Sequence, residues 1–270
     1  MTNKRVALVT GASSGIGEAT AIKLVAVGYS VYGTSRRGAE SSEARFPMLA
    51  LDVTNDESVE NAVAELLRLE GRIDLLVNNA GFGFSPAAAE ESSIEQAKAM
   101  FDTNFHGLVR MTRTVVPYMR RQGGGRIINI GSILGVVPVP YAALYCASKH
   151  AVEGYSEALD HELRTQGIRV SVIEPAYVKT KFEVNNIEPD SKIGEYDVIR
   201  AKLVHVVSEA MSKADEPDVA ADVVVKAAQA SNPKLRYTSG KTARMFAFLR
   251  RFAPASVLDR GIRKNLQLDA

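Results

Sequence analysis

The sequence contains one cysteine, Cys146, in a chain of 270 residues. A single cysteine cannot form a disulfide within the chain, and such usage is typical of proteins in reducing compartments. The sequence has no run of about eighteen apolar residues, so it predicts no integral membrane span. The apolar run near the first residue is also too short for a secretory signal peptide. These absences predict a cytoplasmic protein.

A strong excess of charge is also missing, because 33 Lys and Arg residues stand against 31 Asp and Glu residues, a formal net charge of +2. This balance argues against a dedicated nucleic-acid-binding protein. The segment 232–270 departs from the average, since nine cationic and two acidic residues give it +7 and leave −5 for the rest. The chain contains no internal repeat or low-complexity segment, and its length suits one α/β domain, 1–270.

Short apolar segments, typical of buried strands, alternate along the chain with longer segments of helical periodicity. The predicted strands cover residues 5–9, 30–34, 46–51, 73–77, 126–130, 168–173 and 234–238. The longest predicted helices cover residues 94–121 and 143–163. This alternation predicts an α/β fold with a doubly wound parallel sheet.

A glycine-rich turn, TGASSGIG at residues 10–17, joins the first predicted strand to the first helix. Glycines let the backbone approach a pyrophosphate closely, and a helix N-terminus offers free N–H groups to it. The spacing is GxxxGxG rather than GxGxxG, and a tight turn without a ligand is the alternative. Three glycines and two serines between a strand and a helix favour the phosphate site. Its predicted residues are Gly11, Ser13, Ser14, Gly15, Ile16 and Gly17.

The second predicted strand is followed by Ser35, Arg36 and Arg37. In dinucleotide-binding sites an acid that binds the ribose 2′-hydroxyl is expected at about this distance from the glycine-rich turn. The acid is missing here, and two guanidinium groups favour a 2′-phosphate instead. We therefore predict NADP(H) as the cofactor, with solvated loop arginines as the alternative.

Two further strand ends carry candidate cofactor contacts. Asp52 and Val53 end the third predicted strand, where Asp52 could accept from an adenine amino group or cap the next helix. Asn79, Ala80 and Gly81 follow the fourth strand. Small polar residues at the carboxyl end of a parallel strand can line the ligand crevice, or can simply form a turn.

The segment 131–149 contains the residues for a reduction site. Tyr145 and Lys149 are four residues apart in a predicted helix, so their side chains share one face. The Lys149 ammonium would favour the phenolate and lower the pKa of Tyr145 from about 10. Tyr145 could then exchange a proton with a carbonyl or alcohol oxygen, which the Ser132 hydroxyl would also contact. A plain surface pair is the alternative for this spacing.

Asn104 lies inside the predicted helix 94–121. Asn competes for backbone hydrogen bonds within a helix, so it predicts a kink that places a polar group near Tyr145.

Two segments in the second half of the chain are candidates for substrate contacts. The loosely patterned segment 181–215 follows the sixth strand and is a candidate lid. The basic C-terminal extension, 240–270, contains an apolar helical stripe of Met245, Phe246, Leu249 and Phe252. We expect this stripe to cover the substrate cleft or a partner subunit, with peripheral contact to an anionic membrane as the alternative.

The order and spacing of TGASSGIG, Asp52, NNAG, Asn104, Ser132, YCASK and the Pro175 turn resemble the short-chain dehydrogenase/reductase family over residues 10–180. The resemblance implies a Rossmann-type sheet of seven strands, a nicotinamide cofactor and hydride transfer between an alcohol and a ketone or aldehyde. It implies that Tyr145 is the acid/base and that Lys149 holds the nicotinamide ribose and lowers the pKa of Tyr145. Ser132 would polarise the carbonyl, and Asn104 would keep a water for the proton relay.

Within the family, YCASKHAVEGYSEAL and the long C-terminal extension are most similar to 17β-hydroxysteroid and retinol dehydrogenases. This resemblance implies a small apolar carbonyl or alcohol substrate, and the family's helices at 94–121 and 143–163 imply a homodimer or homotetramer. Pro175, Val178 and Thr180 would contact the nicotinamide, Thr180 at its carboxamide. The family usually has Pro-Gly where this chain has Pro175-Ala176, and Ala has less access to positive φ, so the turn is expected to differ.

Two other functions fit parts of the pattern. A dinucleotide-binding sensor or scaffold without chemistry would need the glycine-rich turn only, so the set of Asn104, Ser132, Tyr145 and Lys149 argues against it. An adaptor at the membrane surface would use the basic extension. No metal-ligand set is predicted.

Overall fold

A computed structural model describes residues 4–38, 45–180 and 186–268. Within these residues, seven strands form one parallel sheet in the order β3-β2-β1-β4-β5-β6-β7. The strands are β1 (Val6–Val9), β2 (Ser30–Ser35), β3 (Met48–Ala50), β4 (Leu75–Asn78), β5 (Gly125–Ile130), β6 (Ile168–Pro175) and β7 (Arg236–Ser239). The strand order reverses between β1 and β4, which is where ligands bind in open α/β sheets. The predicted doubly wound parallel sheet is confirmed.

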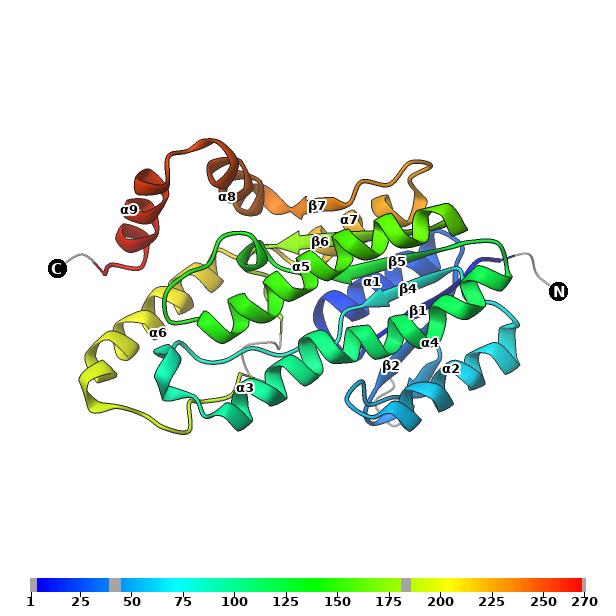
Figure 1. The fold of residues 1–270 in the computed structure, drawn as a ribbon, viewed down its shortest axis with the longest axis horizontal. Coiled ribbons are helices and arrows are strands. Elements are labelled where there is room, and N and C mark those ends of the chain that lie inside the picture. The colour runs from blue at the N-terminus through cyan, green and yellow to red at the C-terminus, as the bar shows by residue number, and fades with distance from the viewer. Residues whose placement is uncertain (1–3, 39–44, 181–185, 269–270) are drawn as a thin grey trace.

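Helices cover both faces of this sheet (Figure 1). α2, α4 and α5 pack on one face, and α1 and α7 pack on the other. The helices are α1 (Gly15–Ala26), α2 (Asp56–Glu70), α3 (Ile94–Phe101), α4 (Gly107–Arg121), α5 (Ala143–Leu163), α6 (Asp197–Ser212), α7 (Pro217–Gln229), α8 (Gly240–Phe252) and α9 (Ala255–Asn265). A 3-10 turn, η4 (Ile133–Gly135), follows β5. No helix in the described part of the chain is long and apolar enough to cross a membrane.

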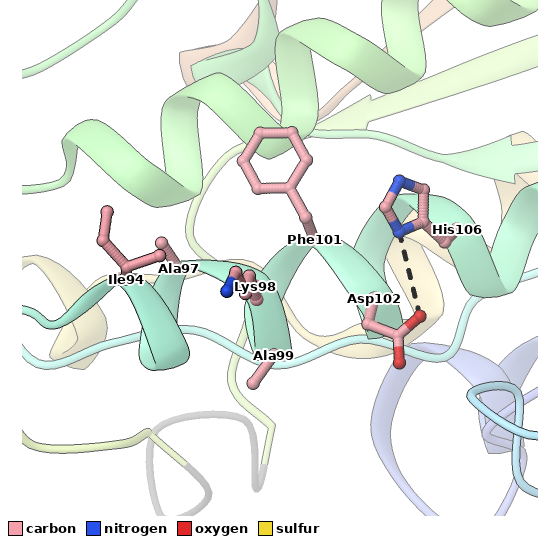
Figure 2. A pocket seen from close by; sticks show the side chains of 7 residues that line it. All are labelled: Ile94, Ala97, Lys98, Ala99, Phe101, Asp102 and His106. Atoms are coloured by element: carbon pink, nitrogen blue, oxygen red, sulfur yellow. Dashed lines mark ion pairs between the residues drawn. The ribbon is translucent and has the colours of Figure 1, made fainter.

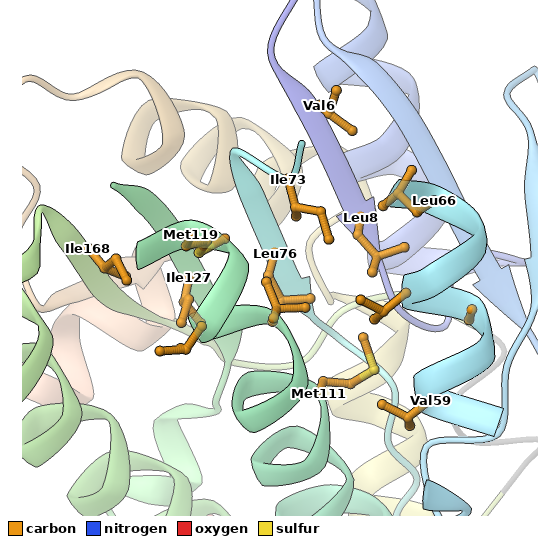
Figure 3. Packing of buried hydrophobic residues seen from close by; sticks show 14 of the residues in the cluster. Val6, Leu8, Val59, Leu66, Ile73, Leu76, Met111, Met119, Ile127 and Ile168 are labelled. Carbon is orange, nitrogen blue, oxygen red and sulfur yellow. The ribbon is translucent and has the colours of Figure 1, made fainter. Parts of the chain in front are cut away.

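Two buried clusters form the core because successive strand residues point to opposite faces of the sheet. Val6 and Leu8 belong to the cluster beneath α2, α4 and α5, whereas Ala7 and Val9 belong to the cluster beneath α1 and α7. Figure 3 shows the first cluster, in which side chains of β1, β4 and β5 meet Met111 of α4 and side chains of α2. Both faces are therefore apolar, which explains the continuous apolar runs of the central strands.

The predicted helix 94–121 is interrupted. A π-helical turn, Asp102–His106, separates α3 from α4 and contains Asn104. The Asn104 amide bonds the backbone of Phe82 in both directions, accepting from its N–H at 3.0 Å and donating to its carbonyl at 2.9 Å. The predicted kink is thus a π-turn, a feature that often marks functional sites.

The two edge strands differ from their predicted bounds. β3 begins at Met48 rather than Phe46, because Pro47 has no N–H to donate to the ladder. Pro47 still accepts from the N–H of Gly33 at 2.9 Å, so it guides the chain into the strand. β7 begins at Arg236 rather than Lys234.

The predicted apolar stripe of the C-terminal extension is buried unevenly. Phe246 and Leu249 are half-buried, but Met245 and Phe252 are 52% and 65% exposed, together with Phe248 at 62%. The buried side chain of α8 is Ala243, which turns Met245, Phe248 and Phe252 away from the sheet. Cover of the substrate cleft or of a partner subunit by the stripe stays a prediction. In the predicted lid, residues 181–185 lie outside the described residues, and α6 forms most of the remainder.

Candidate active site

The predicted reduction site lies at the carboxyl end of β5. Ser132 is buried there and caps η4, since its hydroxyl accepts from the N–H of Leu134 at 3.1 Å. The hydroxyl also lies 3.5 Å from the carbonyl of Pro175 at the end of β6. Because β5 and β6 are neighbours in the sheet, the strand ends fix the position of Ser132 relative to the Pro175 turn.

α5 brings Tyr145 and Lys149 to the same place. The Ser132 hydroxyl forms a hydrogen bond with the Tyr145 phenol. The Lys149 ammonium lies 5.7 Å from the centre of the Tyr145 ring and donates to the carbonyl of Ile130 at 3.0 Å. The structure therefore brings together the three side chains that the sequence selected, between the end of β5 and the first turns of α5.

The predicted fall in the pKa of Tyr145 is wrong in this structure. Burial raises the pKa of Tyr145 to about 12, opposed by the hydrogen bond from Ser132. Tyr145 retains some exposed surface, so water moderates this rise. Burial also lowers the pKa of Lys149 to about 8, which the charge of Glu153 opposes. The phenol thus holds its proton at neutral pH, which suits donation to a carbonyl oxygen.

Asn104 contacts α5 about one helical turn from Tyr145. Its amide nitrogen is 3.4 Å from the hydroxyl of Ser148, which in turn donates to the Tyr145 carbonyl at 2.8 Å. A small cavity of about 10 Å³ adjoins Asn104, Thr10 and Asn78, and that volume holds about one water molecule. Within the described residues, the buried Oδ1 of Asn78 has no hydrogen-bond partner, so a water in this cavity would satisfy it.

The glycine-rich turn has the backbone that the phosphate prediction requires. Gly11 and Gly15 have φ values of +63° and +61°, which side chains rarely adopt. A Cβ on Gly17 would lie 2.4 Å from both the carbonyl oxygen of Gly11 and the amide nitrogen of Asn79. Ser13, Ser14 and Ile16 complete the turn, and Ser14 is the N-cap residue of α1. A glycine-rich turn packed this closely before a helix N-terminus fits a dinucleotide pyrophosphate.

Asn79 and Ala80 hold this turn in place through Thr10. The Thr10 hydroxyl accepts from the N–H groups of Asn79 and Ala80 at 2.9 and 3.0 Å. The Asn79 amide donates to the carbonyls of Thr10 and Gly11 at 2.9 and 3.0 Å. Gly81 lies beside Asn104, since a Cβ there would be 3.0 Å from its Oδ1. Thr10 is absent from the predicted site residues, although its place inside the TGASSGIG motif is a signal.

Ser35 ends β2 beside β3, and Arg36 and Arg37 follow in the turn after it, where both arginines are exposed. Backbone hydrogen bonding from Thr54 is the main cause that lowers the pKa of Asp52, and the charge of Arg36 contributes. The alternative that Asp52 caps α2 is wrong, because Asn55 is the N-cap residue and accepts from the N–H of Ser58 at 2.8 Å. Val53 follows Asp52 and is buried against the cavity beside Asn104. The predicted determinants of the adenine end thus lie near one another.

The segment after β6 is also held close to the glycine-rich turn. Val178 forms a β-bridge with Asp215, and a Cβ on Gly15 would lie 2.9 Å from the Thr180 side chain. Among non-glycine residues in the described ranges, positive φ values occur at Tyr141 and Gln267. Ala176 therefore adopts an ordinary conformation, and the turn after Pro175 does not depend on glycine.

A buried acidic pair beneath the site was missed by the sequence reasoning. Glu153 is one turn beyond Lys149 on α5, and its Oε2 lies 2.9 Å from Nε of Arg236, which is 3.6 Å from Oε1 of Glu174. A Cβ on Gly131, next to Ser132, would be 2.9 Å from Oε1 of Glu153. Burial, with the charge of Glu153, raises the pKa of Glu174 to about 7. Glu153 and Arg236 are 83 residues apart in the sequence, so no local pattern predicts their contact.

An open hollow of about 540 Å³ lies on α3 and the π-turn (Figure 2). Its lining residues are Ile94, Ala97, Lys98, Ala99, Phe101, Asp102 and His106. The hollow contains none of the predicted site residues, and it lies on the helical segment that the family resemblance assigns to a subunit interface. That interface stays a prediction.

Comparisons with known proteins agree with this geometry. The model of the short chain dehydrogenase family matches residues 5–191. The chain is 37% identical over 262 residues to 3-ketodihydrosphingosine reductase of Bacteroides thetaiotaomicron, covering 96% of this chain and 97% of that protein. It also resembles the solved structure of a short chain dehydrogenase from Burkholderia cenocepacia in complex with NADP, with TM-score 0.77 and 26% identity over 95% of this chain and 97% of that one.

A solved 3-ketoacyl-(acyl-carrier-protein) reductase from Brucella melitensis, complexed with NADH, has TM-score 0.72 and 28% identity over 87% of this chain and 97% of that one. Structural neighbours thus include complexes with either nicotinamide cofactor. The predicted family is confirmed by the matched residues and by the relative that aligns over nearly the whole length. The chain belongs to the short-chain dehydrogenase/reductase family of oxidoreductases.

Proposed function

We propose that the protein is an NADPH-dependent reductase of a ketone carried on a long apolar chain. The observation that carries the proposal is the meeting of Ser132, Tyr145 and Lys149 between the end of β5 and the first turns of α5. Burial raises the pKa of Tyr145 to about 12, so the phenol holds its proton at neutral pH and has a proton to donate to a carbonyl oxygen. A dinucleotide fits the turn because Gly11, Gly15 and Gly17 allow close backbone approach.

Bound reduced nicotinamide supplies the hydride that reaches the carbonyl carbon. Tyr145 donates its phenolic proton to the carbonyl oxygen as the negative charge develops there. Ser132 donates a hydrogen bond to the same oxygen, and Lys149 places a positive charge beside the phenolate that remains. Asn104 ties the first turns of α5 to the Phe82 backbone, which keeps Tyr145 in position.

The substrate class rests on the relative and on the apolar residues near the crevice. The relative's name describes reduction of 3-ketodihydrosphingosine, a ketone on a long alkyl chain. Near Asn104, the rings of Phe82 and Phe84 meet edge to face at 6.0 Å, and Phe84 pairs with Ile187, which is 39% exposed. Apolar side chains in this position would contact an alkyl chain. A steroid or retinoid substrate, predicted from the sequence, would use the same apolar contacts.

The test is NADPH oxidation by a panel of 3-keto amines of increasing chain length, with a steroid ketone and retinal as comparison substrates. Each methylene that becomes buried contributes about 0.8 kcal/mol, so kcat/KM should rise steeply with chain length and then level off. Faster reduction of the steroid would contradict the long-chain class. Binding of NADPH without oxidation by any carbonyl would favour the non-catalytic sensor instead.

Location and assembly are further proposals. We propose a cytoplasmic homodimer or homotetramer that uses the helices of residues 94–121 and α5 as its interface. Light scattering of the purified protein tests the assembly, and a monomer at micromolar concentration would contradict it.

A further inference from the structure

α8 presents an apolar stripe to solvent. Met245, Phe248 and Phe252 are each more than half exposed, at 52%, 62% and 65%. Their spacings of three and four place them on one helix face, and the Phe248 and Phe252 rings are 4.9 Å apart. Grouped exposed apolar side chains mark contact surfaces, whereas single ones are ordinary.

The orientation of this stripe is fixed by the opposite side of α8. Ala243 is fully buried, Phe246 and Leu249 are half-buried, and the helix contacts β6, β7 and η4. The core-facing side is therefore already occupied. Met245, Phe248 and Phe252 are left over after α8 has packed against the sheet.

The stripe is surrounded by positive charge. α8 contains no acidic residue, and α9 contains Asp259 alone. The exposed cations of the two helices are Lys241, Arg244, Arg250, Arg251, Arg260, Arg263 and Lys264. Arg251 lies over the Phe252 ring at 5.6 Å, so charge and apolar surface are directly adjacent.

We propose that Met245, Phe248 and Phe252, with the cations of α8 and α9, form a surface that docks onto an anionic lipid membrane. An apolar stripe flanked by Lys and Arg matches the boundary between acyl chains and anionic headgroups. A second copy of this chain fits poorly, because a symmetric contact would set the same seven cations against each other. Nucleic acid would pair with the cations but leave the phenylalanines exposed.

The docking surface lies next to the catalytic residues. α8 contacts η4, the turn that begins immediately after Ser132, and it follows β7 at the edge of the sheet. Figure 1 shows α8 and α9 beyond the carboxyl end of β7. The docked enzyme would thus hold its reduction site near the bilayer, where a long-chain ketone resides. That last step rests on the proposed function, whereas the docking itself does not.

Co-sedimentation of the full chain with vesicles tests the docking without substrate or cofactor. We expect binding to mixed phosphatidylcholine–phosphatidylglycerol vesicles, little binding to pure phosphatidylcholine, and release at high salt. Phe248→Ser with Phe252→Ser should lower the partition coefficient at least tenfold, about 1.4 kcal/mol. Arg250→Gln with Arg251→Gln should weaken binding and flatten its salt dependence.

Matched controls separate a specific surface from general stickiness. Leu69→Ser with Val198→Ser removes two apolar side chains, 46% and 83% exposed, from other helices and should leave binding unchanged. Arg68→Gln with Arg72→Gln removes an exposed arginine pair from the end of α2 and the turn after it. Equal losses in the control variants would overturn the proposal.

Three further outcomes would also overturn it: no binding by the wild type, binding that the α8 variants do not alter, or α8 variants that dissociate an oligomer while the wild type ignores vesicles. The last outcome would assign the stripe to a second copy of the chain. Vesicle binding by a protein that reduces no ketone would contradict the proposed function alone. Ketone reduction without vesicle binding would contradict the docking alone.

Discussion

Helices α5 and α8 both depart from the usual pattern of buried apolar and exposed polar residues, but in opposite ways. α5 buries the polar residues Ser148, Lys149, Glu153, Ser156 and Asp160, whereas α8 exposes Met245, Phe248 and Phe252. Buried charges and grouped exposed aromatics are both uncommon in globular proteins. The difference is that α5 borders the reaction crevice and α8 borders solvent. The partners of each of these residues decide whether the fold alone explains it.

The partners of these residues separate structure from function. Asp160 accepts from Arg164 and Arg169 and from the N–H of Val170, so burial of its charge is compensated within the fold. Lys149 donates to one carbonyl and otherwise faces Tyr145. The α8 stripe leaves more than half of each of its three side chains exposed. Compensation within the chain is therefore complete at Asp160, partial at Lys149 and smallest at the stripe.

The largest effect should come from removing the proton donor of α5. Tyr145→Phe keeps the ring and removes the hydroxyl, and general acid catalysis contributes on the order of 10² to 10⁴ in rate. We expect kcat to fall by that factor while NADPH affinity stays near wild type. Tyr118→Phe, on α4, is the control and should leave kcat unchanged. Near-wild-type turnover by Tyr145→Phe would assign the proton to Ser132 or a water.

The buried acidic pair beneath α5 should make stability depend on pH. The pKa of Glu174 is raised to about 7 from 4.5, so the folded protein binds a proton more readily than the unfolded chain between these values. Stability is thus fully present below about pH 4.5 and is lost as pH rises through about 7, by about 3 kcal/mol. Glu174→Gln should remove this loss and stabilise the protein above about pH 7.

Urea unfolding of wild type and Glu174→Gln across this pH range measures the difference. The control is Glu157→Gln, which changes an exposed carboxylate that binds the same Arg236 at 2.9 Å. Arg236 lowers the pKa of Glu157, so the Glu157→Gln substitution should destabilise the folded protein slightly at neutral pH. If the difference in the free energy of unfolding between wild type and Glu174→Gln does not vary with pH, the raised pKa of Glu174 is contradicted.

The exposed cations Arg36 and Arg37 should determine which nicotinamide cofactor the enzyme prefers. Wild type should prefer NADPH over NADH at least tenfold in kcat/KM, about 1.4 kcal/mol. Ser35→Asp with Arg36→Ala should abolish this preference, and Arg36→Ala alone should account for most of the change. Equal use of both cofactors by the wild type would show that Arg36 and Arg37 are solvated loop charges.

The smallest effect tests the two faces of α8 directly. Phe248→Ser with Phe252→Ser should change the free energy of unfolding by less than about 0.5 kcal/mol, as surface substitutions usually do. Ala243→Asp places a charge on the buried face and should destabilise strongly. NADPH affinity of the Phe248 and Phe252 variant should stay within about threefold, under 0.7 kcal/mol. Strong destabilisation by this variant would mean that the stripe packs against protein.

Local sequence patterns were enough to predict most of the fold and the three central residues of the candidate site. Alternating apolar segments predicted the sheet, and the spacing of Tyr145 and Lys149 placed both on one helix face. These features depend on residues that are close in sequence, and periodicity detects such short-range relations. β3 shortened because Pro47 cannot donate to a strand ladder, a rule that the sequence contains but the apolar run concealed.

The remaining differences arose from contacts between distant segments. The direction of the Tyr145 pKa shift depends on burial by surrounding elements, which no spacing reveals. The π-turn at Asn104 depends on the Phe82 backbone, 22 residues earlier. Periodicity identified an apolar stripe in α8 but could not tell which side of the helix meets the sheet. The structure shows that this side is the one with Ala243.

The most direct test compares both helices in one measurement. Single-turnover oxidation of enzyme-bound NADPH by a long-chain 3-keto amine is followed with the ketone in detergent and in anionic vesicles. The account predicts that Tyr145→Phe is slow in both, whereas the Phe248 and Phe252 variant matches the wild type in detergent and is slow only in vesicles. Fast oxidation by Tyr145→Phe, or equal rates for the α8 variant and the wild type in vesicles, would contradict it.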